Sequence, residues 1–327
     1  MSDLRNRTDT VLYLVIPCYN EEEVLPETSR RLLEKLGTMV ENKMVSPKSR
    51  ILFVNDGSKD KTWDLIEELH EKHPQISGLK LSRNRGHQNA LLAGLMTAVQ
   101  YADMLISMDA DLQDDVDAVD KMVDAYHEGF EVVYGVRSSR KTDSFFKRFT
   151  AEGFYKVMKA LGVDIVFNHA DYRLMSKRAV EGLAEFEEVN LFLRGIVPQI
   201  GYKWTTVEYE RAKRFAGESK YPLKKMLAFA FDGITSFSVK PMRMILSLGA
   251  IIFFLSIAAL VWALIARFTG HSVGGWASLM CSIWMIGGIQ LLCLGVIGEY
   301  IGKIYKETKK RPRFIIERVL DANIERK

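Results

Sequence analysis

Two uncharged stretches near the C-terminal end dominate the pattern of apolar and polar positions along the chain. They cover residues 244–266 and 272–298, and a short segment containing Arg267 separates them. At about 1.5 Å of rise per residue, helices of these lengths exceed the roughly 30 Å hydrocarbon core of a bilayer. The pattern therefore predicts two transmembrane helices joined by a short loop, in preference to two buried helices of a soluble protein.

The first 135 residues show a different pattern, in which short apolar runs alternate with amphipathic stretches. This alternation predicts strands and helices in turn, which is typical of a mostly parallel sheet covered by helices on both faces. The expected fold class is α/β. The predicted strands lie at residues 11–16, 51–54, 79–81, 104–108 and 131–135.

Two further stretches combine basic residues with apolar positions at helical spacing. A basic run over residues 137–148 precedes the first, and residues 221–243 contain the second. Both are candidate interfacial helices, although packing of the first against the sheet is an equal alternative. We expect a cytosolic domain over 1–220, a juxtamembrane amphipathic helix over 221–243, two transmembrane helices over 244–298 and a cytosolic basic tail over 299–327.

The distribution of charge predicts the orientation in the membrane. Basic residues flank the outer ends of the two apolar stretches, and Arg267 is the basic residue between them. The first ten residues have no apolar core of signal-peptide type, and the three cysteines offer no disulfide framework. We therefore expect a multi-pass protein of the plasma membrane with its catalytic domain and both termini in the cytoplasm. The net charge of +4 is too small and too dispersed for a nucleic-acid-binding stripe.

A polar cluster follows each of the first four predicted strands, and in parallel sheets ligands bind at these strand ends. The fourth cluster places Asp109, Asp111, Asp114 and Asp115 within seven residues. Carboxylates this close repel one another unless a cation lies among them, and oxygen ligands suit Mg²⁺ or Mn²⁺ bound to a substrate diphosphate. An acidic, solvated loop is the alternative. Neither a G-x-G-x-x-G motif after the first strand nor a P-loop motif is present.

Five motifs together resemble the polyprenyl-phosphate glycosyltransferases of glycosyltransferase family 2, which include bactoprenol glucosyltransferases and dolichyl-phosphate mannose synthase. The resemblance runs from about residue 11 to 313 and implies a GT-A (Rossmann-like) fold, a nucleotide sugar donor and a lipid phosphate acceptor. The motifs are Ile16-Pro17-Cys18-Tyr19-Asn20-Glu21, Val54-Asn55-Asp56-Gly57-Ser58, Arg83-Asn84-Arg85-Gly86-His87, Asp109-Ala110-Asp111-Leu112-Gln113 and Phe215-Ala216-Gly217-Glu218-Ser219-Lys220-Tyr221.

The resemblance also implies roles for single residues. Asp171 matches the family's carboxylate near the reacting sugar, and Arg137 and Arg148 would hold the acceptor phosphate. Lys220 would contact phosphate or diphosphate. The nucleotide pocket would be lined by Pro17, Tyr19, Glu21, Asp56 and Asp109, and Mg²⁺ or Mn²⁺ would be held by Asp111 and Gln113 with Asp109 beside them.

The reaction expected from this resemblance is inverting transfer of a sugar to undecaprenyl phosphate, giving a polyprenyl-phosphate monosaccharide for cell-envelope glycan modification. UDP-glucose and UDP-N-acetylglucosamine are the favoured donors. A phosphate monoester with a second pKa of about 6 is already anionic in the cytosol, so a general base is dispensable. Asp171 is then a base, an orienting carboxylate or a mere salt-bridge partner of Arg173. The alternatives are a processive polysaccharide synthase and a non-catalytic nucleotide-sugar-binding membrane protein, and a homo-oligomer is possible in each case.

Overall fold

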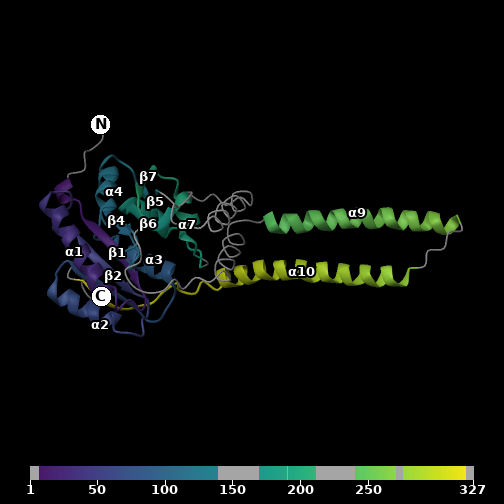
Figure 1. The fold of residues 1–327 in the computed structure, drawn as a ribbon, viewed down its shortest axis with the longest axis horizontal. Helices are drawn as coiled ribbons and strands as arrows, with labels where there is room; N and C mark the ends of the chain where they lie inside the picture. The colour runs from purple at the N-terminus through teal and green to yellow at the C-terminus, as the bar shows by residue number, and fades with distance from the viewer. Residues whose placement is uncertain (1–6, 139–168, 190, 211–239, 270–274, 322–327) are drawn as a thin grey trace. The chain divides into compact units, whose positions relative to one another are not determined.

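The computed structural model describes residues 7–138, 169–189, 191–210, 240–269 and 275–321 (Figure 1). The chain divides into two compact units. One unit contains the sheet and its helices, including the residues from Arg311 onward, and the other contains two long helices. The first predicted interfacial helix and residues 221–239 of the second lie outside the described residues, and residues 240–243 begin the first of the two long helices.

The centre of the sheet consists of four parallel strands in the order β4-β1-β2-β3. They are β1 (Leu12–Cys18), β2 (Arg50–Asn55), β3 (Ile76–Leu81) and β4 (Met104–Ser107). Their buried apolar residues explain why the sequence shows β1, β2 and β4 as short apolar runs. Strand β3 begins at Ile76, before the predicted residues 79–81, because Ser77 and Gly78 interrupt its apolar pattern. The predicted α/β fold is confirmed in this part of the chain.

Four more strands extend the sheet on both sides. Beyond β4 lie β6 (His169–Ser176), β5 (Val132–Arg137) and β7 (Trp204–Tyr209), and β6 is antiparallel to both of its neighbours. Beyond β3 lies β8 (Ile316–Leu320), which is antiparallel to it. The insertion of β6 between β4 and β5 brings Asp171 next to the strand that precedes the acidic cluster.

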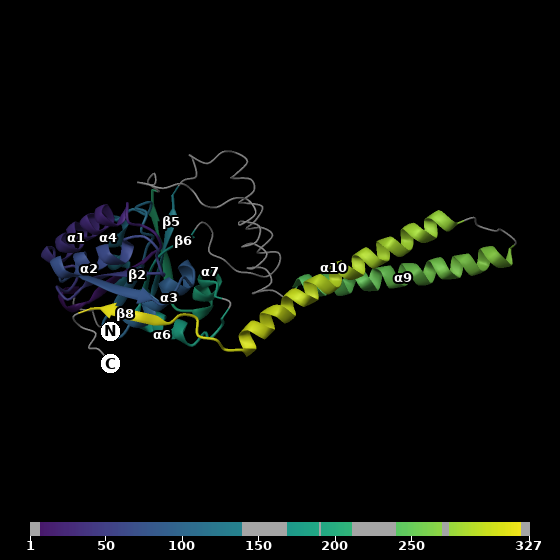
Figure 2. The same cartoon turned by 90° about the horizontal axis from the view of Figure 1, so that it is seen from below.

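Helices cover both faces of the sheet (Figure 2). On one face, α1 (Leu25–Glu41), α2 (Thr62–Lys72) and α4 (Ala118–His127) bury a core that includes Leu14 and Phe53. On the other face lie α3 (His87–Ala98) and α6 (Lys177–Ala184). Three short elements complete the unit, namely η1 (Arg7–Asp9), α7 (Leu193–Ile196) and η2 (Val197–Ile200).

Helix α3 approaches the sheet closely at Gly94. A Cβ atom at this position would lie 2.4 Å from Val15 Cγ1 and 2.7 Å from Val54 Cγ2, well inside van der Waals contact. The absence of a side chain at Gly94 therefore sets the distance between α3 and strands β1 and β2. This packing matters for the site because α3 begins with His87 at the sheet's functional edge.

The second unit consists of α9 (Lys240–Phe268) and α10 (Trp276–Thr308). Segments Lys240–Ala258 and Met285–Thr308 are long and apolar enough to cross a membrane, judged by length and composition. The prediction of two apolar helices is confirmed, but their ends differ from the uncharged runs. Helix α10 continues past the uncharged run to Thr308. The residues there include Glu and Lys, which are charged but are good helix formers, so the end of the apolar run is not the end of the helix.

The basic tail expected over 299–327 has more structure than its composition indicated. After α10, the chain returns to the sheet as β8, where Lys80 Nζ lies 2.7 Å from Glu317 Oε1. Arg318 forms a second ion pair with Glu67. The strand has only five residues and two of them are charged, so its pattern in the sequence is weak.

Candidate active site

The polar loops after β1 and β2 are joined to each other by hydrogen bonds. The backbone N–H of Asn20 donates to Ser58 Oγ over 3.0 Å, and the N–H of Lys59 donates in return to Asn20 Oδ1 over 2.9 Å. The N–H of Glu21 donates to Thr62 Oγ1 over 3.0 Å. These contacts confirm that the first two polar clusters meet at the carboxyl edge of the sheet, as the pattern of the sequence predicts.

Asp56 connects this edge to the third polar cluster. Its carboxylate accepts hydrogen bonds from the backbone N–H of Arg85 over 2.7 Å and of Gly86 over 2.9 Å. Burial raises the pKa of Asp56, although both backbone donors oppose that change. Asp56 therefore holds the two residues that directly precede α3. The sequence does not reveal these hydrogen bonds. The contact of Asp56 with a nucleotide stays a prediction.

The other residues predicted to line the nucleotide pocket lie on the loop after β1. Tyr19 is 40% exposed, so its ring is accessible for stacking on a base. Pro17 is buried within β1, where it pairs in register with Val54. Glu21 is partly buried at the start of the turn that leads into α1. Their roles toward a nucleotide stay predictions.

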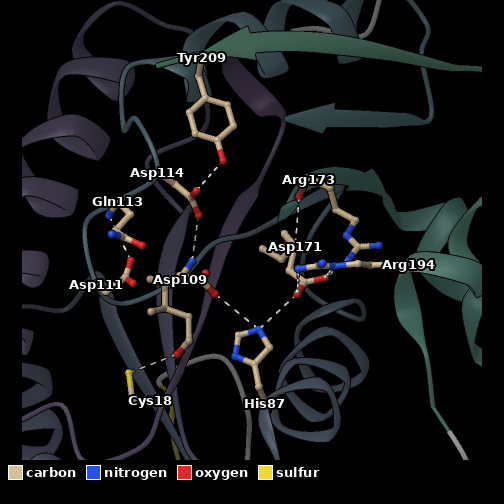
Figure 3. Close-up of polar contacts among 12 residues, drawn as sticks. Cys18, His87, Asp109, Asp111, Gln113, Asp114, Asp171, Arg173, Arg194 and Tyr209 are labelled. Carbon is tan, nitrogen blue, oxygen red and sulfur yellow. Dashed lines mark hydrogen bonds and ion pairs between the residues drawn. The ribbon is translucent and has the colours of Figure 1, made fainter. Parts of the chain in front are cut away.

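The loop after β4 carries the predicted metal ligands (Figure 3). Asp111 Oδ1 accepts a hydrogen bond from the backbone N–H of Gln113 over 3.1 Å. Leu112, between them, has a φ of 57°, which is uncommon for a residue with a branched side chain. The loop is thus held in a conformation that costs energy, and such conformations concentrate at functional sites.

Asp114 connects this loop to strand β7 through hydrogen bonds. Its carboxylate is buried, and it accepts a 2.6 Å hydrogen bond from Tyr209 Oη and a 3.4 Å hydrogen bond from the Asp109 N–H. Burial, together with the charge of Asp109, raises the pKa of Asp114 to about 6. Asp114 therefore links the end of β7 to the acidic loop.

Asp171, on β6, is held by two arginines (Figure 3). Arg173 Nη2 lies 2.7 Å from Asp171 Oδ1, and Arg194 Nη2 lies 3.1 Å from Asp171 Oδ2. Burial acts to raise the pKa of Asp171, but the positive charges of Arg194 and Arg173 outweigh it and hold the pKa well below its usual range. Asp171 is therefore a carboxylate with little affinity for a proton.

His87 lies between the acidic loop and Asp171 (Figure 3). Its Nε2 is 3.5 Å from Asp109 Oδ1 and 3.9 Å from Asp171 Oδ2. The structure thus brings together Asp109, predicted for the nucleotide and metal, and Asp171, predicted for the sugar. A donor whose diphosphate lies at Asp109 would place its sugar toward Asp171.

Several residues of this site carry no role in the sequence-based prediction. His87 is the last residue of the Arg83–His87 motif, and its place in that motif is a signal in the sequence, whereas Arg194 lies in none of the five motifs. Tyr209 had no such signal, because a tyrosine at the end of a strand is common in cores. The contact of Asp171 with Arg173, foreseen as an alternative, is present together with the Arg194 contact.

The predicted phosphate-binding basic residues are only partly described. Arg137 ends β5, and its positive charge lowers the pKa of both Asp114 and Tyr209 against the larger effect of burial. Its Nε is buried without a hydrogen-bond partner among the residues that the structure describes. Arg148 and Lys220 lie outside the described residues, so their predicted contacts with phosphate are untested.

Comparisons with known proteins identify the family of both units. Residues 13–183 match glycosyl transferase family 2, and residues 240–304 match the GtrB C-terminal hairpin. The uncharacterized glycosyltransferase YkoT of Bacillus subtilis is 55% identical over 95% of this chain and 92% of its own. The bactoprenol glucosyl transferase of Shigella phage SfII is 40% identical over 93% of this chain and 97% of its own.

Solved structures are more distant. The mannosyltransferase PcManGT from Pyrobaculum calidifontis, in complex with GDP-Man and Mn²⁺, is 16% identical, with 93% of this chain and 88% of that chain covered and a TM-score of 0.43. The sequence matches confirm the predicted GT-A fold class and the resemblance to polyprenyl-phosphate glycosyltransferases. Since both the catalytic unit and the hairpin match, and two relatives align over more than nine tenths of its length, the chain belongs to glycosyltransferase family 2.

Proposed function

We propose that the protein transfers one sugar from a nucleotide sugar to polyprenyl phosphate at the cytoplasmic face of the membrane. The proposed donor is UDP-glucose or UDP-N-acetylglucosamine, and the proposed acceptor is undecaprenyl phosphate. Direct attack by the acceptor oxygen on the anomeric carbon inverts the configuration there. Relatives named bactoprenol glucosyl transferase, aligned over almost their whole length, support the choice of a lipid acceptor.

The observation that carries this proposal is the return of the chain to its own sheet after the hairpin. Strand β7, which precedes the hairpin in the chain, and strand β8, which follows it, belong to one folded unit. Two membrane-spanning helices inserted between two parts of one unit must begin and end on the same side of a bilayer. This arrangement supports a hairpin that keeps the active site beside the leaflet in which a polyprenyl phosphate is embedded, and the basic residues flanking it support the cytoplasmic side.

The donor would bind along the edge formed by the first four polar clusters. Tyr19 would offer its exposed ring to the base, and Asp56, Glu21 and Pro17 would line the nucleotide pocket with it. Asp109 would then lie near the diphosphate and, across His87, close to the carboxylate of Asp171. This order of base, diphosphate and sugar follows the order of the strands that carry these residues.

A divalent cation, Mg²⁺ or Mn²⁺, fits the chemistry of the acidic loop. Asp109, Asp111 and Gln113 offer carboxylate and amide oxygens, which are the ligands that these ions prefer. The described residues contain no group of three His, Cys, Asp or Glu side chains close enough to hold an ion by themselves. Such a loop suits an ion that takes its remaining ligands from a bound diphosphate. When bound, the ion neutralises charge on the leaving nucleotide.

The acceptor phosphate needs charge neutralisation more than it needs a base. Asp171 has a pKa far below that of a phosphate monoester, so it would not take a proton from the acceptor. We therefore assign Asp171 the orienting role, toward a sugar hydroxyl or toward the arginines that it holds. Arg137 and Arg148 would bind the acceptor phosphate, with Lys220 on phosphate or diphosphate, and so reduce repulsion between two anionic substrates.

The test is reconstitution of the purified full-length protein with undecaprenyl phosphate, a panel of sugar nucleotides, and Mg²⁺ or Mn²⁺. Mass spectrometry of the extracted lipids should show one added sugar for one donor of the panel. Anomeric configuration, read by NMR of the released sugar, should be opposite to that of the donor. The Arg148→Ala variant should need far more lipid phosphate for the same rate.

Other results would favour the alternatives. Donor binding with no glycolipid from any nucleotide sugar would overturn the enzymatic proposal in favour of a binding protein. Lipids or free chains carrying many sugars would instead indicate a processive polysaccharide synthase. An Arg148→Ala variant with unchanged dependence on lipid phosphate would remove that residue from the acceptor site.

A further inference from the structure

The first half of the acidic loop after β4 is held by a hydroxyl group from α1. Thr28 is 1% exposed, and its Oγ1 donates to the carbonyl of Ala110 over 2.8 Å. The same oxygen lies 3.1 Å from the carbonyl of Val24 in its own helix, so the hydroxyl lies between the helix and the loop. Ala110 separates the predicted ligands Asp109 and Asp111. The contact therefore fixes the backbone between them.

Two tyrosines hold the second half of the loop. Tyr209 Oη donates to Asp114 Oδ1 over 2.6 Å (Figure 3), and Tyr172 Oη donates to the carbonyl of Asp115 over 2.9 Å. The two rings meet edge to face with centroids 5.2 Å apart. Gly135 leaves room for the ring of Tyr172, because a Cβ there would lie 2.9 Å from its Cδ1. The loop is thus held directly after its last predicted metal ligand.

The acidic loop needs such support when no cation is bound. The carboxylates of Asp109 and Asp111 lie close in the chain, and like charges so near each other repel. Leu112 between the predicted ligands has a φ of 57°, a conformation that persists only where its surroundings hold it. Three hydroxyl donors from α1, β6 and β7 supply contacts that oppose relaxation of the loop.

We propose that Thr28, Tyr172 and Tyr209 are positioning residues that hold the acidic loop in its cation-binding conformation before the cation arrives. The inference rests on the proposed function, in which this loop holds Mg²⁺ or Mn²⁺. None of the three hydroxyl groups is assigned to the cation itself, so each acts through the loop. Ligands that are already in place need less rearrangement when the ion binds, which raises the affinity for the ion.

The test uses full-length variants that remove one hydroxyl each and keep the shape of the side chain. They are Thr28→Val, Tyr172→Phe and Tyr209→Phe. Thr97→Val is the matched control for the threonine, because its hydroxyl donates within its own helix α3. Tyr126→Phe is the matched control for the tyrosines. Its hydroxyl donates to a backbone carbonyl just before β4, at the edge of the sheet opposite the acidic loop.

Binding of Mn²⁺ is measured by electron paramagnetic resonance, with and without saturating UDP. The three variants should raise the dissociation constant for Mn²⁺ by about tenfold to a hundredfold, the range found for outer partners of metal ligands. Both controls should bind Mn²⁺ like the wild type, and so should Thr28→Ser, which keeps the hydroxyl. In glycolipid synthesis, saturating Mn²⁺ should return the variants toward the wild-type rate, which a general loss of structure would not allow.

Unchanged dissociation constants for Mn²⁺ in the three variants would overturn the inference, even if their melting temperatures fell. A wild type that binds no Mn²⁺ in the presence of UDP would overturn it as well. A variant that does not fold leaves the other two, which remove different hydroxyl groups. The proposed function fails separately if the wild type forms no glycolipid with any donor, and in that case the Mn²⁺ affinities still decide about the three positioning residues.

Discussion

Replacing Arg173 with methionine tests how the Asp171 site is held together. Arg173 is almost fully buried and makes a 2.7 Å contact with Asp171 and a 3.4 Å contact with the Leu193 carbonyl. Removal of one partner of a buried ion pair costs about 3–5 kcal/mol when the other charge is left alone. Here Arg194 remains on Asp171, so the expected loss is that of one charge-assisted hydrogen bond, about 2–3 kcal/mol.

The converse substitution, Asp171→Asn, should cost more. It leaves the guanidinium of Arg173 buried without a counter-charge, which corresponds to the full penalty of about 3–5 kcal/mol. Because both single changes remove the same contact, the Asp171→Asn/Arg173→Met double variant should lose less than the sum of the two, by about 1–3 kcal/mol.

Thermal unfolding of the purified protein, followed by tryptophan fluorescence, measures these losses. Trp63 lies in the core of the catalytic unit and reports its unfolding. At about 2–4 °C per kcal/mol for a domain of this size, Arg173→Met should lower the melting temperature by about 4–12 °C. A drop of less than about 1 °C, or strictly additive losses in the double variant, would refute the view that Arg173 and Asp171 stabilise each other.

Three further predictions concern pH, metal and packing. Because the arginines lower the pKa of Asp171, its stabilising effect is fully present above the unfolded pKa of about 4 and is lost as pH falls; the gap in melting temperature between wild type and Asp171→Asn should be constant from pH 6 to 8 and should narrow below pH 4. Asp111→Asn should need at least about tenfold more Mg²⁺ or Mn²⁺ for half-maximal glycolipid synthesis, and full activity at the wild-type metal concentration would remove Asp111 from the metal site. Gly94→Ala should destabilise the protein by about 1–3 kcal/mol, because its Cβ would overlap Val15 and Val54; an unchanged melting temperature would show that α3 can shift away from the sheet.

The parts of the fold that the sequence predicts are those with a strong local pattern. Strands β1, β2, β4 and β5 and the two long helices contain continuous apolar runs, because their residues are apolar throughout a stretch of one element. The pattern of β3 is weaker, since Ser77, Gly78 and Lys80 interrupt it. Strand β8 has no such pattern, because it lies at the edge of the sheet and its half-exposed residues gain stability from the pairing with β3. The position of β6 between β4 and β5 is likewise a long-range pairing that no local pattern encodes.

The site shows the same division. The polar clusters after the parallel strands meet as predicted, since topology alone brings strand ends together. Other contacts join side chains to groups that are remote in sequence. Examples are the hydrogen bonds of Asp56 with the backbone of Arg85 and Gly86, and of Asp114 with Tyr209. Such contacts depend on the orientation of each side chain, which one sequence does not record.

Strand β8 also has a consequence for the order in which the molecule can be completed during synthesis. The outer edge of β3 is formed from residues near the start of the chain, and its partner strand follows both apolar helices. The final strand is therefore synthesised only after both helices of the hairpin. This edge of the sheet stays open until the hairpin has been synthesised, so an unpaired β3 marks each chain whose hairpin has not yet been made.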